Sequence, residues 1–176
     1  MAQEFFDDSA WMEAAFAAEY RQSADHFVLG RRMQLFIMQS FYRHFLVDRN
    51  PFDLLDLGCG DGELAANIAE VAPHARLTLV DGSADMLAAA QERFRERSNG
   101  QQDVQIMQHT FAELIADPSL LGQYDMIVSG FAIHHLYLAE KTALFDLIHR
   151  SLKPGGAFVN IDTVFPSTSP ALMDWY

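Results

Sequence analysis

The stretch Leu54-Leu55-Asp56-Leu57-Gly58-Cys59-Gly60-Asp61-Gly62-Glu63 decides the fold. An apolar run passes into a turn with glycine at alternate positions, and a helical pattern begins at Glu63. This order is typical of the first unit of a parallel sheet, in which ligands bind where the strands end. The glycine spacing differs from the Gly-x-Gly-x-x-Gly of dinucleotide-binding loops. Because Asp61 and Glu63 lie at the start of the helix, the loop favours a neutral or cationic ligand over a phosphate.

Outward from this loop, short β-like runs alternate with helical runs. The predicted strands are Phe52–Leu57, Arg76–Asp81, Val104–His109, Met126–Gly130 and Ala157–Thr163. The predicted helices between them are Glu63–Val71, Ala84–Arg97, Ala112–Ala116 and Glu140–Leu152. This alternation predicts an α/β fold with a mainly parallel sheet and right-handed crossovers.

Residues 1–50 have a different pattern, which predicts helices alone. Apolar side chains recur at intervals of three and four in two runs: Trp11, Met12, Ala15, Phe16 and Tyr20, then Met33, Phe36, Ile37, Phe41, His44 and Phe45. Core packing is the simpler interpretation of these runs. The alternative is a lid that folds over the carboxyl ends of the strands and excludes water. We expect one domain overall, with a helical lid at 1–50 and a binding core at 51–176.

Composition excludes several classes of protein. The 176 residues include 12 Lys and Arg against 24 Asp and Glu, for a net charge of −12. Such a surface repels phosphate backbones and anionic lipid, so we expect neither a nucleic-acid nor a membrane partner. Cys59 is the single cysteine, which excludes an internal disulfide, and we predict no metal site. No run approaches the ~18 apolar residues of a membrane span, and the acidic start lacks a secretion-signal pattern, so we predict a cytoplasmic protein.

A second candidate binding element ends the second predicted strand, at Leu79-Val80-Asp81-Gly82-Ser83. An acid at this place can accept hydrogen bonds from both hydroxyls of a ribose. Ser83 is expected to cap the next helix, with Met86 one turn further on, where it can cover an adenine face. Asp81 alone fits a carboxylate that begins a helix equally well. Together with the glycine loop, a ribose contact becomes the favoured interpretation.

The motifs together resemble the class I S-adenosylmethionine-dependent methyltransferases. They are Asp56–Gly62, Asp81, Tyr124–Ser129 with Ile133–Leu136, and Leu152–Phe158, in the family's order across residues 52–163. Each motif is weak alone, but the set is specific for fold and cofactor and almost silent on the acceptor. The resemblance implies a Rossmann-like three-layer sandwich with strand order 3-2-1-4-5. It also implies S-adenosyl-L-methionine as cofactor, with S-adenosyl-L-homocysteine as product.

The resemblance also implies which residues contact the cofactor: Tyr20, Asp56, Gly58, Cys59, Gly60, Asp81, Gly82, Met86, Thr110, Phe111 and Ser129. Asp56 would organise the ammonium group and Asp81 would hold the ribose. Thr110 stands where the family often has an aspartate for the adenine amino group. The Thr110 hydroxyl and the Phe111 N–H would make those contacts instead.

His134 and His135 are the candidate catalytic residues. They follow the fourth predicted strand, beside the switch point between strands 1 and 4, where the resemblance places the reactive methyl group. An attacking hydroxyl or ammonium group must lose a proton, and a histidine can accept it. The alternative is structural, with one ring capping the next segment and the other packing against the N-terminal helices. An acceptor that is already a carboxylate or a neutral amine would need no base.

The family's sixth and seventh strands, an antiparallel hairpin, have no counterpart after Thr163. The fifth strand would then be an exposed apolar edge, which invites pairing with another chain. We expect a chain truncated after the fifth strand, with a homodimer through this edge or a natural short form as alternatives. The predicted function is methyl transfer to an O or N atom of a small molecule. Two alternatives stay open: a non-catalytic, regulatory module that binds the cofactor, and an enzyme that modifies the cofactor itself.

Overall fold

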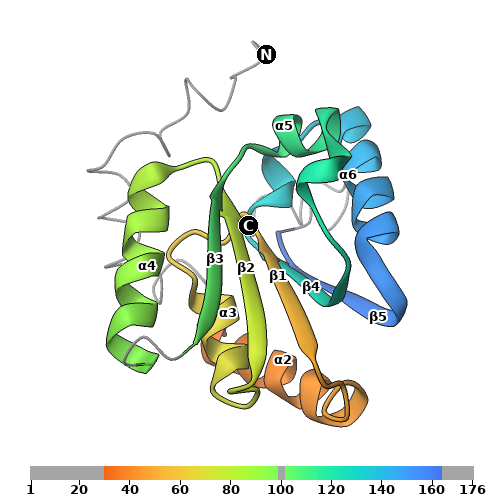
Figure 1. Cartoon of the computed structure of the whole chain (residues 1–176). Helices are drawn as coiled ribbons and strands as arrows, with labels where there is room; N and C mark the ends of the chain where they lie inside the picture. Colours follow the sequence, from red (N-terminus) through yellow and green to blue (C-terminus); the bar gives the residue numbers. More distant parts are fainter. Residues whose placement is uncertain (1–29, 99–101, 164–176) are drawn as a thin grey trace, which may run out of the picture.

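Five parallel strands form the centre of the protein (Figure 1). The structure is a computed structural model that describes residues 30–98 and 102–163. The strands are β1 Phe52–Leu57, β2 Ala75–Asp81, β3 Asp103–Gln108, β4 Tyr124–Gly130 and β5 Leu152–Ile161. They lie in the order β3-β2-β1-β4-β5, and all neighbours pair in parallel. The predicted sheet and strand order are confirmed.

Helices cover both faces of the sheet. They are α2 Arg31–Phe45, α3 Glu63–Ala69, α4 Ala84–Ser98, α5 Phe111–Ala116 and α6 Leu138–Ser151, with short 3₁₀ turns η3 Pro118–Leu120 and η4 Ile133–His135. Because successive side chains of a strand point to opposite faces, β1 serves two cores. Leu54 packs with residues of α2, α3 and α4, whereas Leu55 and Leu57 pack with residues of α5 and α6. All three leucines are completely buried, as expected for the central strand of a parallel sheet.

The described part of the predicted N-terminal helical region is α2. Its inner face buries Met38 and Tyr42, and the Tyr42 ring lies 4.8 Å from that of Phe52, the first residue of β1. Helix α2 therefore packs beside α3 near the amino ends of the strands (Figure 1). This is the opposite end from the one that a lid would cover. The other predicted helical run, which includes Tyr20, lies outside the described residues, and its role as a lid stays a prediction.

The fifth strand begins earlier than the sequence pattern suggested. The sequence pattern predicts a strand from Ala157, with residues 153–156 between it and the predicted helix that ends at Leu152, but β5 starts at Leu152 directly after α6. The pairing jumps from Tyr124↔Leu152 to Met126↔Ala157, so the extra residues form an irregularity within the β4–β5 pair. The prediction was wrong because a proline and two glycines indicate a turn, whereas here the backbone bulges and continues as a strand.

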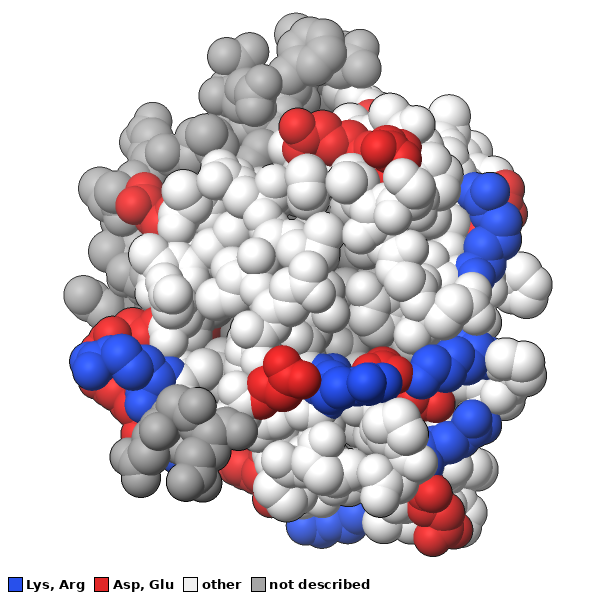
Figure 2. Space-filling view, viewed as in Figure 1, with Lys and Arg blue, Asp and Glu red and all other residues white. Residues whose placement is uncertain are grey.

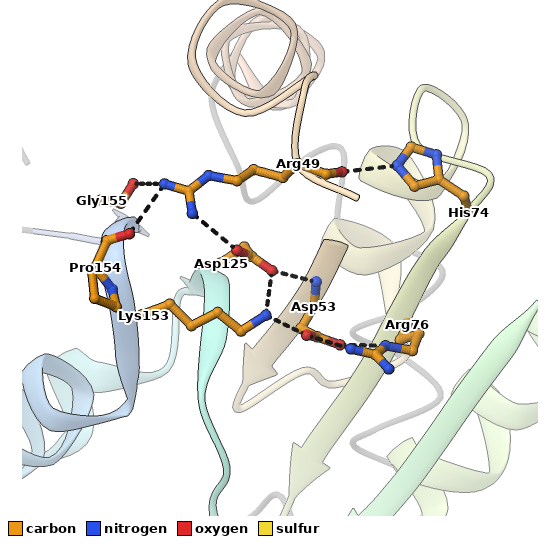
Figure 3. Close-up of polar contacts among 8 residues, drawn as sticks. All are labelled: Arg49, Asp53, His74, Arg76, Asp125, Lys153, Pro154 and Gly155. Carbon is orange, nitrogen blue, oxygen red and sulfur yellow. Dashed lines mark hydrogen bonds and ion pairs between the residues drawn. The ribbon is translucent and has the colours of Figure 1, made fainter. Parts of the chain in front are cut away.

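Charged side chains from distant parts of the chain hold this irregularity (Figure 3). Lys153 Nζ contacts Asp125 Oδ2 at 2.7 Å and also pairs with Asp53, so one ammonium joins β1, β4 and β5. Arg49 donates to the carbonyl oxygens of Pro154 and Gly155 at 3.2 and 3.0 Å. The cluster lies at the amino ends of the strands and leaves their carboxyl ends for binding.

Two further observations concern possible partners of the described chain. Within residues 30–98 and 102–163, β4 is the one strand that pairs with β5. The homodimer and the truncation predicted from that edge remain predictions. In the same residues, no helix is both long enough and apolar enough to cross a membrane.

Candidate functional site

Three loops meet at the carboxyl edge of the sheet. Gly58, at the end of β1, has φ +64°, a left-handed conformation that favours glycine. A Cβ atom added there would lie 2.5 Å from the Cβ of Ala132 and 3.0 Å from the ring of Phe111. The loops after β1, β3 and β4 are therefore in direct contact at this glycine. The sequence analysis placed Gly58 and Phe111 at the cofactor site, and the structure brings them together; it also adds Ala132, which the sequence analysis did not name.

The middle glycine of the loop has open space in front of it. Gly60 has φ +53°, and a Cβ atom added there would meet nothing within 4 Å. By contrast, Gly62 faces Leu79, Phe94 and Ala90 at 3.0–3.3 Å, so its missing side chain allows β2 and α4 to pack closely. The loop thus has a packed glycine at each end and an accessible backbone between them. This is the arrangement in which a ligand can approach the main chain.

Asp81 connects the glycine loop to the loop after β2. Its Oδ2 atom accepts the Gly60 N–H at 2.8 Å, and its Oδ1 atom accepts the Ser83 N–H at 2.9 Å. Burial raises the pKa of Asp81, and the backbone N–H groups of Ser83, Gly60 and Gly82 oppose that shift. Each carboxylate oxygen has two acceptor positions, so the carboxylate keeps capacity for a further donor.

Asp56 has one buried oxygen with no hydrogen-bond partner among the described residues. Its Oδ2 atom accepts the Ala65 N–H at 3.0 Å, while Oδ1 is unpaired. Burial, together with the nearby carboxylates of Asp81 and Asp61, raises the pKa of Asp56 to about 7, and the Ala65 N–H opposes that shift. A buried, unpaired carboxylate oxygen is costly, and a cationic donor would satisfy it.

The acidic groups at the start of α3 are less exposed to a ligand than the sequence suggested. Arg93 of α4 pairs with both Asp61 and Glu63, and its Nε–H donates to the Asp61 carbonyl oxygen at 2.7 Å. One guanidinium therefore offsets one of the two carboxylate charges. Sequence reasoning missed this pair because Arg93 lies 32 residues from Asp61. The helix carries several arginines, and the sequence does not show which of them contacts the glycine loop.

The other predicted cofactor contacts are placed as follows. Gly82 follows Asp81 directly, and its carbonyl oxygen accepts from Gln108 Nε2 at 3.2 Å. Met86, in the first turn of α4, is only 2% exposed, and its N–H donates to Ser83 Oγ at 3.4 Å. Cys59 is buried as well, and burial raises the pKa of its thiol well above the usual range. The thiol is thus protonated and is no nucleophile.

Two predicted contacts have hydroxyls that already serve the fold. Thr110 caps α5: its hydroxyl oxygen accepts the Glu113 N–H at 3.2 Å and donates to the Glu113 carboxylate. Ser129 is fully buried, and its hydroxyl donates to the Leu57 carbonyl oxygen at 2.7 Å, which ties β4 to β1. A cofactor contact by Thr110 stays a prediction that rests on its remaining lone pair. For Ser129, the side chain is already used between the strands.

His134 and His135 lie on η4, after β4, at the same edge. Their ring centroids are 4.0 Å apart. Burial and the neighbouring His134 ring lower the pKa of His135. His134 contacts Asp162 twice: its backbone N–H donates to Oδ2 at 2.9 Å, and its Nδ1 atom lies within hydrogen-bonding distance of Oδ1. The sequence analysis missed Asp162, although this acid directly follows the fifth strand, close to the position that Asp81 has at the end of the second.

Within residues 30–98 and 102–163, no group of three or more His, Cys, Asp or Glu side chains is arranged to hold a metal ion. A glycine loop, a strand-end carboxylate and a histidine pair at the carboxyl edge of a 3-2-1-4-5 sheet define a Rossmann-like binding protein. The sequence profile of the methyltransferase domain family matches residues 55–158, more than half of the chain. The chain belongs to that family.

Two relatives with similar sequences have names that state different methyl acceptors. The chain is 30% identical over 108 residues to the tetracenomycin polyketide synthesis 8-O-methyl transferase TcmO of Streptomyces glaucescens. It is 34% identical over 106 residues to the ribosomal RNA small subunit methyltransferase C of Citrobacter koseri. These alignments cover 61% and 58% of the chain, and the chain spans only 30% and 29% of the two relatives.

A similar fold is found in the crystal structure of magnesium protoporphyrin IX methyltransferase from Synechocystis PCC 6803 with bound S-adenosylmethionine. The TM-score is 0.60 at 21% identity, with 81% of this chain and 68% of the other chain covered. At this identity the likeness concerns the fold alone.

Proposed function

We propose that the chain binds S-adenosylmethionine at the carboxyl edge of β1 and β2 and transfers its methyl group to an O or N atom of a small molecule. The observation that carries the proposal is the unpaired, buried Oδ1 atom of Asp56 behind the glycine loop. The cofactor's ammonium group is a cationic donor of the kind that this oxygen lacks. Asp81, whose carboxylate keeps acceptor capacity, would hold the ribose hydroxyls. Membership of the methyltransferase domain family supports the same cofactor.

The cofactor would supply an electrophilic methyl group, and the protein's residues position and deprotonate the acceptor. Gly60 leaves open space beside its Cα for the ligand, while its N–H is bonded to Asp81. Gly58 lets the loop after β4 approach closely, which brings the histidine pair to the same edge as the binding loop. His134 or His135 would accept the proton that an attacking hydroxyl or ammonium group releases.

The charge distribution supports a small acceptor. Asp56, Asp81 and Asp162 lie at the carboxyl edge, whereas Arg49, Arg76 and Lys153 cluster at the amino ends of the strands. Figure 2 shows acidic side chains alone at the top, over α5, and acidic and basic side chains mixed along the lower half and the right flank. A phosphate backbone brought to the carboxyl edge would meet mainly acids. The O-methyltransferase relative points in the same direction, while the ribosomal RNA relative makes RNA the rival acceptor.

Calorimetric titration with S-adenosylmethionine, S-adenosylhomocysteine and NAD tests the cofactor. We expect micromolar binding of the first two and none of NAD. Asp81→Ala should weaken binding by roughly tenfold or more, because a ribose hydrogen bond to a carboxylate contributes about 1.5–3 kcal/mol. Asp117→Ala is the matched control, since Asp117 only caps the turn at Ser119. Equal affinities for wild type and Asp81→Ala would remove the ribose role.

Labelled-methyl transfer tests the acceptor. Phenols, amines and carboxylic acids should be assayed beside ribosomal RNA, each with the wild type and a cofactor-free blank. Transfer to RNA alone would overturn the small-molecule proposal. Tight cofactor binding with no transfer to any acceptor would favour the regulatory module instead. Cytoplasmic location remains a prediction that cell fractionation would test. Pairing through the β5 edge remains a prediction that size measurements in solution would test.

A further inference from the structure

The contact between His134 and Asp162 determines which ring nitrogen of His134 can accept a proton from an acceptor. The geometry points to Asp162 as a positioning residue that fixes the tautomer of His134, leaving Nε2 as the base for an acceptor that carries a hydroxyl group. This inference rests on the proposed methyl transfer and narrows its acceptor to compounds that must lose a proton as they react, of which hydroxyl compounds are one class. Asp162 is 8% exposed and follows β5, whereas His134 is 32% exposed and follows β4.

The tautomer follows from counting donors around Asp162. Its carboxylate accepts the His134 backbone N–H on Oδ2 at 2.9 Å and the Thr163 backbone N–H on Oδ1 at 2.9 Å. An ionised carboxylate is an acceptor only, so the His134 Nδ1 atom beside Oδ1 must carry a hydrogen. A neutral imidazole has one N–H. Its lone pair is therefore on Nε2, the ring atom that faces away from Asp162.

The loop after β4 connects the His134–Asp162 pair, called the dyad below, to the glycine loop. His134 is two positions beyond Ala132, whose Cβ lies against Gly58. Phe131, the residue before Ala132, has a left-handed φ of +52°. Its N–H donates to the Ile161 carbonyl oxygen at 2.8 Å. Strained, non-glycine backbone of this kind persists where the surroundings fix it, and it recurs at functional sites. The loop after β4 is thus held from both sides, by β1 and by β5.

In the proposed step, the acceptor's oxygen uses a lone pair to form a bond to the methyl carbon. The bond from that carbon to sulfur breaks, and its electron pair stays on sulfur. The acceptor's O–H bond breaks at the same time, and the proton passes to His134 Nε2. The imidazolium that results keeps its Nδ1–H on the Asp162 carboxylate, which stabilises its charge. The proton then leaves to water, and the neutral ring is restored.

Asp162→Asn is the decisive variant. The His134 backbone N–H requires an acceptor, so the asparagine oxygen takes the place of Oδ2 and its NH₂ group faces Nδ1. The exposed Thr163 amide can turn to water. With a donor opposite it, Nδ1 must become the acceptor, and the hydrogen moves to Nε2. Nitrogen-15 spectra of the ring in the cofactor-free protein should show Nδ1–H in the wild type and Nε2–H in the variant. The Nε2–H tautomer in the wild type would overturn the inference.

Activity gives the second readout, on phenols of graded acidity. For weakly acidic phenols, Asp162→Asn and His134→Gln should lose roughly 10²- to 10⁴-fold in kcat, the usual contribution of a general base. For phenols that are already ionised at the assay pH the loss should be small, and the affinity for S-adenosylmethionine should be unchanged. Asp117→Asn, which alters another backbone-bonded aspartate, should match the wild type. A loss that is equal across the series would make Asp162 merely structural and overturn the inference.

The two proposals fail in different ways. If the chain binds no S-adenosylmethionine, the proposed function fails, while the tautomer measurement still decides the role of Asp162. If methyl transfer occurs at full rate in both Asp162→Asn and His134→Gln, the methyltransferase stands and the dyad is overturned. Should Asp162→Asn not fold, His134→Gln carries the activity test, because its side chain still offers an amide N–H to Asp162.

Discussion

The two ends of the sheet contain similar numbers of carboxylates but use them differently. At the amino ends, Asp53 and Asp125 each contact cations directly, and Lys153 joins them (Figure 3). At the carboxyl ends, Asp56 and Asp81 accept backbone N–H groups and contact no cation in any described ion pair, and one Asp56 oxygen is unpaired. The first arrangement satisfies its charges and ties strands together. The second leaves acceptor capacity where a ligand can use it.

The largest effect should come from filling Gly58. Gly58→Val adds a branched side chain at φ +64°, where even a Cβ atom would meet Ala132 at 2.5 Å. Left-handed strain and overpacking together predict a loss of about 2–5 kcal/mol in unfolding free energy. We also expect no measurable binding of S-adenosylmethionine. Gly60→Ala is the control, since it has open space and should cost only about 1–2 kcal/mol. Similar losses in both variants, measured by urea unfolding, would mean that the packing at Gly58 is unimportant.

At the amino ends, the prediction is loss of stability without loss of binding. Asp125→Ala removes the partner of Lys153, of Arg49 and of the Asp53 N–H, which donates to Asp125 at 2.9 Å. Asp125 is 2% exposed, and breaking a buried pair from one side costs about 3 kcal/mol. Cofactor affinity, measured below the unfolding transition, should stay within about twofold, well under the tenfold that one lost hydrogen bond costs. A large loss of affinity would mean that the two ends of the sheet are coupled.

The unpaired carboxylate should make stability depend on pH. Burial raises the folded-state pKa of Asp56 to about 7, against about 3.9 in the unfolded chain. Between these values the folded protein holds a proton that the unfolded chain releases, so the contribution of Asp56 to stability is greatest below pH 4 and is lost as the pH rises to 7. Asp56→Asn removes this dependence, on the order of a few kcal/mol.

Urea unfolding at pH 5 and pH 8 measures the difference. The variant should keep a weaker slope of the same sign, because burial also raises the pKa of Asp81. Parallel slopes in the wild type and in Asp56→Asn would contradict the assignment of the pH dependence to Asp56.

The smallest effect should come from an exposed pair at the amino ends. Arg76→Ala removes a two-pronged contact with Asp53, at 2.6 and 2.7 Å, but the arginine side chain is 52% exposed. Surface pairs contribute little, because solvent screens them and both side chains lose freedom. The unfolding midpoint should barely move, and moderate salt should produce the same small change in the wild type. A loss as large as that of Asp125→Ala would show that the cluster acts as one unit.

The sequence was sufficient to predict the sheet and the site residues that are close to one another along the chain. Alternating patterns predicted every strand to within a few residues except β5, and the glycine spacing predicted the loop with its acids at strand ends. Long-range side-chain pairs were not predictable in this way. Arg93 on Asp61 and Asp162 on His134 join segments 32 and 28 residues apart, and no local pattern says which of many charged side chains will meet. The hydroxyls of Thr110 and Ser129 looked available for a ligand because their partners become visible only in three dimensions.

The contact between Gly58 and Ala132 also predicts correlated variation at these two positions among related chains. The two positions are 74 residues apart, but each fixes the size that the other can have. A chain with a larger residue at 132 must keep glycine at 58 and displace the loop after β4, and a chain with a side chain at 58 must lose the close approach altogether. The two sites should therefore vary together, and a drift to bulkier residues at 132 would mark lineages in which this loop has been rebuilt for a different acceptor.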